Sequence, residues 1–106
     1  MSHQPRTGQR MEVVLPVEVR WKSRSGTYRQ VCGKTYNISG NGLFVTVPIR
    51  PRLKTPVTIT VSLPPDITQI PVELLCQGRV VRWNLKGKHP GLAAIIDDYE
   101  LRPVQH

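Results

Sequence analysis

Alternation of apolar and polar residues is the feature that most limits the folds open to this chain. Along residues 11–21 one face is apolar and carries Met11, Val13, Leu15, Val17, Val19 and Trp21. The other face is mostly charged, with Val14 as an apolar exception. A repeat of two over this length predicts a β-strand that is buried on one side. Pro16 has no backbone N–H, so we expect it at a sheet edge or a bulge.

Strand-like stretches continue along the rest of the chain, separated by glycine, proline and polar turn residues. They are Tyr28–Ile38, Leu43–Val47, Val57–Leu63, Ile70–Trp83 with a bend at Gly78, and Leu92–Ile96. Asp97 and Asp98 are expected to end the last strand. No stretch shows capped helical periodicity over three turns. The pattern predicts an all-β fold, a small antiparallel six-stranded β-barrel of split or Greek-key type, because closure removes exposed strand edges.

The length of 106 residues suits one domain that folds without cross-links. Residues 1–9 are polar and lack periodicity, so they are expected to form a flexible N-terminal arm. Residues 10–98 are expected to form the barrel. Residues 99–106 are expected to be a C-terminal tail with room for little or no helix.

The segment Asn37-Ile38-Ser39-Gly40-Asn41-Gly42 lies between two of these strands. Gly40 and Gly42 can take a positive φ without steric cost, and Asn41 tolerates it, so a tight hairpin is expected here. Asn37 and Ser39 are two residues apart and therefore on one face of the strand. Their amide and hydroxyl could receive a flat polar ligand. This stretch alone favours a plain hairpin, because Asn-Gly between apolar runs is the strongest short-range hairpin signal.

Two arginines, Arg6 and Arg10, flank Gly8 just before the first strand. The pattern Arg-x-x-x-Arg followed by Asn-x-Ser-x-x-Gly resembles the paired signature of PilZ domains, the bacterial receptors for cyclic di-GMP. The resemblance extends from Arg6 to about Asp98. It includes a Gly-Arg-Val-Val-Arg strand and a late Gly-Leu-Ala-Ala-Ile strand. It implies a β-barrel, to which many members of the family add a C-terminal helix.

The resemblance also implies a ligand, cyclic di-GMP, and the residues that bind it. Arginine forks match the O6 and N7 edge of guanine and the oxygens of phosphate. By this resemblance Arg6 and Arg10 grip the ligand from the arm, Asn37 and Ser39 bond it from the barrel, and Gly42 keeps the backbone close. Further candidates are Gly40, Arg79, Arg82 and Trp83. Strand alternation would place Arg79 and Trp83 on one face and Arg82 on the other.

The formal net charge of +8 indicates an anionic partner without identifying it. A nucleic-acid-binding barrel of the OB or SH3-like kind is therefore the alternative function. Such barrels usually interleave aromatic and basic residues on an exposed face. Here aromatic residues are 6% of the chain and fall mostly at expected core positions, which argues against this alternative. The expected partners are cyclic di-GMP and an unidentified downstream protein, and the sequence does not fix the oligomeric state.

No nucleophile–base pair, paired carboxylates or metal-ligand cluster is visible, so we expect neither an enzyme nor a metal site or cofactor. Cys32 and Cys76 lie in apolar strands, and we expect both to be reduced core residues. The sequence has no signal peptide and no apolar run that could span a bilayer. We therefore expect a cytoplasmic protein.

Overall fold

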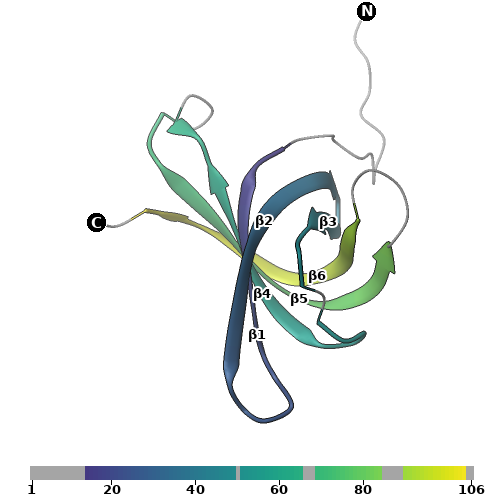
Figure 1. Ribbon diagram of the computed structural model, residues 1–106. Helices are drawn as coiled ribbons and strands as arrows, with labels where there is room; N and C mark the ends of the chain where they lie inside the picture. Colours follow the sequence, from purple (N-terminus) through teal and green to yellow (C-terminus); the bar gives the residue numbers. More distant parts are fainter. Residues whose placement is uncertain (1–13, 50, 66–68, 85–89, 105–106) are drawn as a thin grey trace, which may run out of the picture.

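The computed structural model describes residues 14–49, 51–65, 69–84 and 90–104. The elements assigned in these ranges are β-strands (Figure 1). They are β1 (Pro16–Lys22), β2 (Tyr28–Ser39), β3 (Gly42–Thr46), β4 (Pro56–Leu63), β5 (Val72–Asn84) and β6 (Gly91–Pro103).

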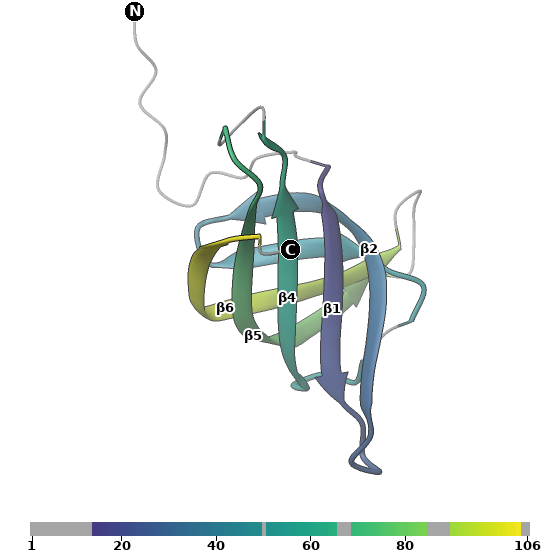
Figure 2. The same ribbon diagram turned by 90° about the vertical axis from the view of Figure 1, so that its left-hand side faces the viewer.

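The six strands close into an antiparallel barrel in the order β1-β2-β3-β6-β5-β4, with β4 pairing to β1. Hairpins connect β1 to β2 and β2 to β3, and further hairpins connect β4 to β5 and β5 to β6. The segment between β3 and β4 connects two strands that are not paired with each other. Figure 2 shows β6, β5, β4, β1 and β2 side by side. The predicted six-stranded all-β barrel is confirmed.

The core consists of side chains that point into the barrel from alternate positions of each strand. Its fully buried members are Ile59, Leu92, Val19, Val45, Val61, Val80, Thr35 and Cys76. The apolar face predicted for the first strand is buried at Leu15, Val17, Val19 and Trp21. Each side chain of this size contributes about 1.5–3 kcal/mol when it is removed from water. The alternation therefore carries most of the information that specifies the barrel.

The prediction that both cysteines lie in the core is wrong for Cys32, which is exposed, and right for Cys76. On β2 the buried positions are Val31 and Thr35, so the strand repeat points Cys32 outward. Both cysteines are free thiols.

The last strand is longer than expected. We expected it to end before Asp97, but β6 continues to Pro103 and pairs with β5 along its whole length. The segment expected to be a C-terminal tail, residues 99–106, is therefore extended strand as far as Pro103. A partner strand of matching length makes the extension favourable, because each added residue pair forms ladder contacts.

Leu15 connects the start of the barrel to β2 through two hydrogen bonds with Thr35. Its N–H donates to the Thr35 hydroxyl at 2.8 Å, and its carbonyl accepts from the Thr35 N–H at 2.8 Å. Pro16 follows as the first residue of β1. It pairs with Lys34 of β2 but with no residue of β4, so it stands at an edge position, as expected. The expected flexible arm, with Arg6 and Arg10, lies outside the described residues.

Three irregularities interrupt the pairing registers near one side of the barrel. Tyr36 is an extra residue on β2, Asp97 is extra on β6, and Val81 is extra on β5. The bend expected at Gly78 coincides with the second of these shifts. An extra residue reverses the alternation beyond it. These bulges therefore decide which side chains share a face.

Candidate functional site

Two rows of side chains cross the outer face of the barrel where β2, β3, β6 and β5 lie next to one another. Residues that oppose each other on paired strands point to the same face. The first row is Asn37, Phe44, Ala93 and Arg82, and the second is Ser39, Gly42, Ile95 and Arg79. The row between them, which includes Leu43, Ala94 and Val80, is buried in the core. The two rows are thus external.

A shallow hollow of about 230 Å³ lies on these rows. Its lining consists of Asn37, Ser39, Gly42, Leu43, Phe44, Val81, Arg82, Ala93, Ala94 and Ile95. We call it the outer-face hollow. The lining includes the small residues Gly42 and Ala93, and it has polar groups from β2 and β5, two strands that are distant in sequence. The structure therefore brings together three hairpin residues of the predicted site and one of its second-tier arginines.

Asn37 and Ser39 offer polar groups to this hollow. The Asn37 amide forms no hydrogen bond within the described part of the chain, and its side chain is half-buried. The Ser39 hydroxyl donates to the Gly42 carbonyl at 3.3 Å, a long contact that leaves its own acceptor capacity free. A ligand with donors and acceptors at its edge could pair with both side chains without displacing a strong internal bond.

The hairpin turn itself differs from the expectation. Among the described residues a positive φ occurs at Gly26, Lys54 and Gln69. The turn at Gly40 and Asn41 therefore closes without the left-handed conformation expected for it. Gly42 matters instead for space. A Cβ at this position would lie 3.3 Å from the Ala94 carbonyl oxygen and 3.4 Å from the Ser39 hydroxyl oxygen.

The assignment of faces on β5 is also corrected. Because Val81 is an extra residue, Val80 pairs with Ala94 and Arg82 pairs with Ala93. Arg79 and Arg82 consequently share the outer face, and Trp83 opposes the buried Leu92. Alternation without the bulge predicted that Arg79 and Trp83 would share a face.

The two arginines differ in their availability. Arg79 forms two hydrogen bonds from its Nη1 to the carboxylate of Asp97, at 2.8 and 2.9 Å. Arg82 lines the hollow and has no hydrogen bond or ion pair within the described ranges. A free guanidinium beside an open amide and a hydroxyl is suited to an anionic or acceptor-rich ligand.

Gly40 and Trp83 lie elsewhere. Gly40 lines a second hollow of about 170 Å³, on the other side of the hairpin turn, together with Asn41, Cys76, Ile96 and Tyr99 among others. The Trp83 Nε1 donates to the Pro51 carbonyl at 2.8 Å, and its ring borders the loop of residues 52–55. Arg6 and Arg10 are outside the described residues. The structure thus assembles the barrel side of the predicted site.

The hollow also contains residues that sequence reasoning did not select. Phe44, Ala93 and Ile95 are part of its lining. The Phe44 ring meets the Tyr36 ring edge to face, with centroids 6.1 Å apart. The pair of alanines in Gly-Leu-Ala-Ala-Ile was visible in the sequence as a run of small residues. Only the pairing of β3 with β6 shows that this run lies under the hairpin.

Other kinds of site have no support in the described ranges. They contain no group of three or more His, Cys, Asp or Glu side chains that could hold a metal ion. Nor does any helix in them have the length and apolar character needed to cross a bilayer.

Comparison with solved structures finds the same barrel in other proteins. The inhibitor of motility from Bacillus subtilis, MotI/DgrA, superposes with a TM-score of 0.69 at 17% identity, over 92% of this chain and 45% of that one. The chain thus spans less than half of that protein. The PilZ domain of CeSA, from a cellulose-synthesizing bacterium, superposes with a TM-score of 0.56 at 27% identity. That match covers 85% of this chain and 82% of the other.

Comparison with curated protein sequences finds no match. The family comparison is positive: residues 4–96 match the PilZ domain. This range includes Arg6 and Arg10, the hairpin of Asn37 and Ser39, and the whole outer-face hollow. PilZ domains are binding modules for cyclic di-GMP rather than enzymes, as the resemblance implied. The chain belongs to the PilZ domain family.

Proposed function

We propose that this protein is a cyclic di-GMP receptor whose barrel-side contacts are Asn37, Ser39 and Arg82, with Gly42 leaving room for the ligand. The observation that carries the proposal is that these residues line one hollow on the outer face. The side chains of Asn37 and Arg82 form no hydrogen bond or ion pair within the described part of the chain. Arg6 and Arg10 complete the site from the N-terminal segment.

The chemistry of the ligand suits these side chains. Each guanine of cyclic di-GMP presents O6 and N7 acceptors, and each phosphate carries one negative charge. The Arg82 guanidinium can donate two parallel hydrogen bonds to either group. The Asn37 amide can donate and accept at the edge of a base. Phe44 adds an apolar wall next to these polar groups.

The hollow is too small to enclose the whole ligand, which supports a contribution to the site from the N-terminal segment. Pockets that enclose a small molecule usually measure about 300–1,000 Å³, and the outer-face hollow measures about 230 Å³. It can hold part of a cyclic dinucleotide, so the remainder needs another wall. The five Cα–Cα steps from Arg10 to Leu15 span at most about 18 Å when extended. Leu15 is bonded to Thr35, two residues before Asn37, so Arg10 is within reach of the hollow.

We further propose that ligand binding orders the N-terminal arm and that the ordered arm is the surface that a downstream protein recognises. The arm has no apolar periodicity that would hold it against the barrel. The ligand would supply the anionic and flat partners that Arg6 and Arg10 can grip together. An order–disorder change of this kind converts ligand binding into a new surface.

Calorimetric titration of the chain with cyclic di-GMP tests the receptor proposal. Arg82→Ala should weaken binding by about 10- to 100-fold, because a hydrogen bond to a charged group contributes about 1.5–3 kcal/mol. Arg79→Ala is the matched control: it removes an arginine three positions away that is already paired with Asp97. It should bind nearly as the wild type does. Arg10→Ala should lose most binding, by about 2–5 kcal/mol.

The alternative of a nucleic-acid-binding barrel is distinguished in the same experiment. Duplex DNA is titrated at two salt concentrations beside the cyclic dinucleotide. Binding to DNA through charge alone falls steeply as salt rises. Comparable affinities for both ligands, with the same salt dependence and no effect of Arg82→Ala, would contradict the receptor proposal.

A further inference from the structure

The end of β6 leaves a strand edge open. Strand β3 pairs with β6 only along residues 92–95, and the Ile96 N–H donates to the Asn41 carbonyl at 2.8 Å. From Asp97 to Pro103, β6 pairs with β5 on one side, and no described strand pairs with its other side. Figure 1 shows this end of β6, in yellow, running away from β3 toward the C-terminus. This segment of β6 is therefore a free edge within the described ranges, and free edges favour pairing with another strand.

The hydrogen-bonding pattern identifies the backbone groups on this edge. The Val104 N–H donates to the Pro71 carbonyl, so Val104 faces β5. Hydrogen-bonded and non-hydrogen-bonded pairs alternate in an antiparallel ladder. The backbone groups of Tyr99, Leu101 and Pro103 therefore point away from β5. Proline supplies a carbonyl but no N–H.

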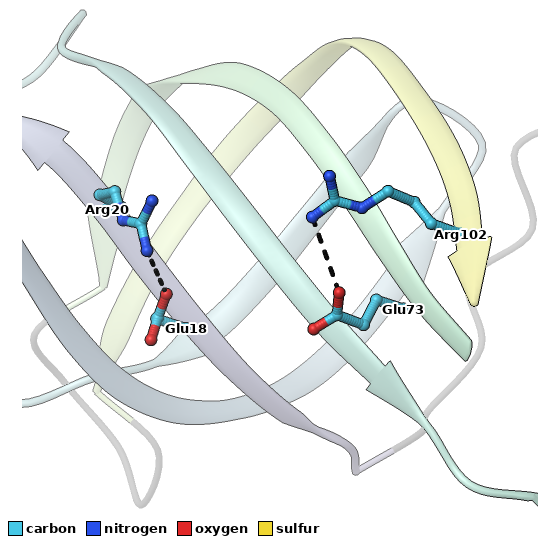
Figure 3. A network of polar contacts seen from close by, with 4 residues as sticks. All are labelled: Glu18, Arg20, Glu73 and Arg102. Carbon is cyan, nitrogen blue, oxygen red and sulfur yellow. Dashed lines mark hydrogen bonds and ion pairs between the residues drawn. The ribbon is translucent and has the colours of Figure 1, made fainter. Parts of the chain in front are cut away.

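The side chains at this edge separate into an apolar and a charged face. Tyr99 and Leu101 oppose Cys76 and Leu74 on the inner face, and they are 67% and 62% exposed. Glu100 and Arg102 occupy the outer face. Arg102 makes one long contact with Glu73, at 3.6 Å between Nη2 and Oε1 (Figure 3). Glu100 has no ion pair in the described ranges.

We propose that this edge binds a second copy of the same chain, with the two β6 strands antiparallel and Leu101 on the two-fold axis. In this register Leu101 exchanges both backbone hydrogen bonds with its symmetry copy. The Tyr99 N–H donates to the Pro103 carbonyl of the other chain. Glu100 then opposes Arg102 of the other chain, and the symmetry repeats this ion pair. A two-fold axis makes such an interface self-complementary.

The charges of Glu100 and Arg102 favour a second copy of this chain as the partner, and they favour a two-fold axis at Leu101. Glu100 and Arg102 are two residues apart on one face, so a two-fold axis through Leu101 matches each with its opposite. Moving the axis to Glu100 would oppose the two Glu100 carboxylates directly, which is unfavourable. On the inner face, the apolar row of Leu74 and Leu101 continues into the same row of the second copy. This would cover the exposed Leu101 and Tyr99.

Charge reversal at the edge tests the proposal, with sedimentation equilibrium as the measurement. Glu100→Arg or Arg102→Glu alone opposes like charges at both symmetric positions, and each should weaken the dimer by about tenfold or more. The double reversal restores opposite charges and should restore the dimer. A mixture of the two single variants should also associate, because each supplies the charge that the other lacks. This mixture shows that both single variants are folded.

Glu18 and Arg20 provide the matched control. They form the same Glu-x-Arg pattern on β1, with a contact of 3.1 Å (Figure 3). Strand β1 is paired on both edges, by β2 and β4. Reversing Glu18 or Arg20 changes net charge equally and should leave association unchanged. A wild-type chain that stays monomeric at several hundred micromolar would overturn the proposal. So would single reversals at the edge that dimerise as the wild type does, or a double reversal that stays monomeric.

Discussion

Arg79 and Arg82 illustrate how neighbouring residues of the same type differ in what they can do. Both point outward from β5, in register with the hairpin that carries Asn37 and Ser39. The Arg79 guanidinium already satisfies the carboxylate of Asp97, and both side chains are about half exposed. An exposed pair of this kind contributes little to stability, about 0–1 kcal/mol. The pair occupies Nη1 of Arg79, and Arg82 is the arginine that lines the hollow.

Substitution of Gly42 should lower the affinity for ligand much more than it lowers the stability of the fold. Gly42→Ala adds a methyl group to the lining of the hollow, 3.3 Å from the Ala94 carbonyl oxygen and 3.4 Å from the Ser39 hydroxyl oxygen. The barrel needs to adjust by only a few tenths of an ångström, so the free energy of unfolding should fall by less than about 1 kcal/mol. Affinity for cyclic di-GMP should fall by about tenfold or more, because the methyl group occupies ligand space. Calorimetry and thermal unfolding measure the two effects.

Gly26→Ala is the control with the opposite profile. Gly26 has a φ of 89° in the turn between β1 and β2, a conformation that costs an alanine about 1–2 kcal/mol. This variant should be less stable and bind normally. Equal loss of affinity in both variants would mean that Gly42 acts through the fold.

The two cysteines should react very differently with a thiol reagent. Cys32 is exposed, whereas burial raises the pKa of the Cys76 thiol from 9.0 to about 11. The reactive species is the thiolate. At pH 8 the native protein should therefore show one fast thiol with Ellman's reagent, and the second should react only after unfolding. Immediate reaction of both thiols in the native protein would contradict the burial of Cys76.

The same raised pKa gives a pH dependence of stability. The folded state disfavours the Cys76 thiolate, so this contribution to stability is complete below the ordinary pKa of 9.0. It is lost as the pH rises from about 9 through 11. Denaturant unfolding at pH 8 and pH 10.5, on the wild type and on Cys76→Ala, measures it. The wild type should lose more stability between the two pH values than the variant does.

At the scale of the strands, alternation predicted nearly all of the fold. Six strand-like stretches correspond to six strands. The repeat of two is clearest in the first of them, because a barrel wall with one buried face imposes that repeat on a strand. The misses have local causes. Strand β6 extends past Asp97 because β5 is long enough to pair with it, and nothing in the sequence of β6 itself reports the length of its partner.

The candidate site was predictable only in part, for a related reason. Asn37, Ser39 and Gly42 lie within one hairpin, so a short motif contains their geometry. Arg82 joins them through the β3–β6 and β6–β5 pairings and through the bulge at Val81. A bulge adds one residue and reverses the faces beyond it. No local repeat in Gly-Arg-Val-Val-Arg reveals that shift, so the facing of Arg79, Arg82 and Trp83 was predicted incorrectly.

The bulge region itself should be sensitive to substitution at Gly78. A Cβ added there would collide with the backbone carbonyl oxygen of Ile95, and backbone cannot rotate away as a side chain can. Gly78→Ala should lower the free energy of unfolding by about 1–3 kcal/mol. Gly40→Ala is the control, since Gly40 is exposed and its φ is not in the left-handed region. It should stay within about 0.5 kcal/mol of the wild type. Urea unfolding that shows equal stability for both variants would contradict the close approach at Gly78.

For the whole molecule, the positive charge and the shallow hollow complement each other. A net charge of +8 raises the local concentration of an anionic ligand around the protein. The hollow alone encloses about 230 Å³ and so leaves much of a cyclic dinucleotide uncovered. The receptor proposal therefore requires that affinity come from two separate parts of the chain, the barrel wall and the N-terminal segment. Loss of either part should reduce binding strongly.

Amide hydrogen exchange across residues 1–10 tests this division of the site. We expect fast exchange without ligand and slower exchange at saturating cyclic di-GMP, because Arg6 and Arg10 would then be held against the ligand. Ordering each residue costs about 1–2 kcal/mol of backbone entropy. Arg82→Ala, measured at a ligand concentration that still saturates it, should keep the protection of the arm, since the arginines of the arm remain. Arg10→Ala should lose that protection even when the hollow is occupied. If exchange in residues 1–10 stayed the same in the saturated wild type, the arm would not be the element that signals ligand binding.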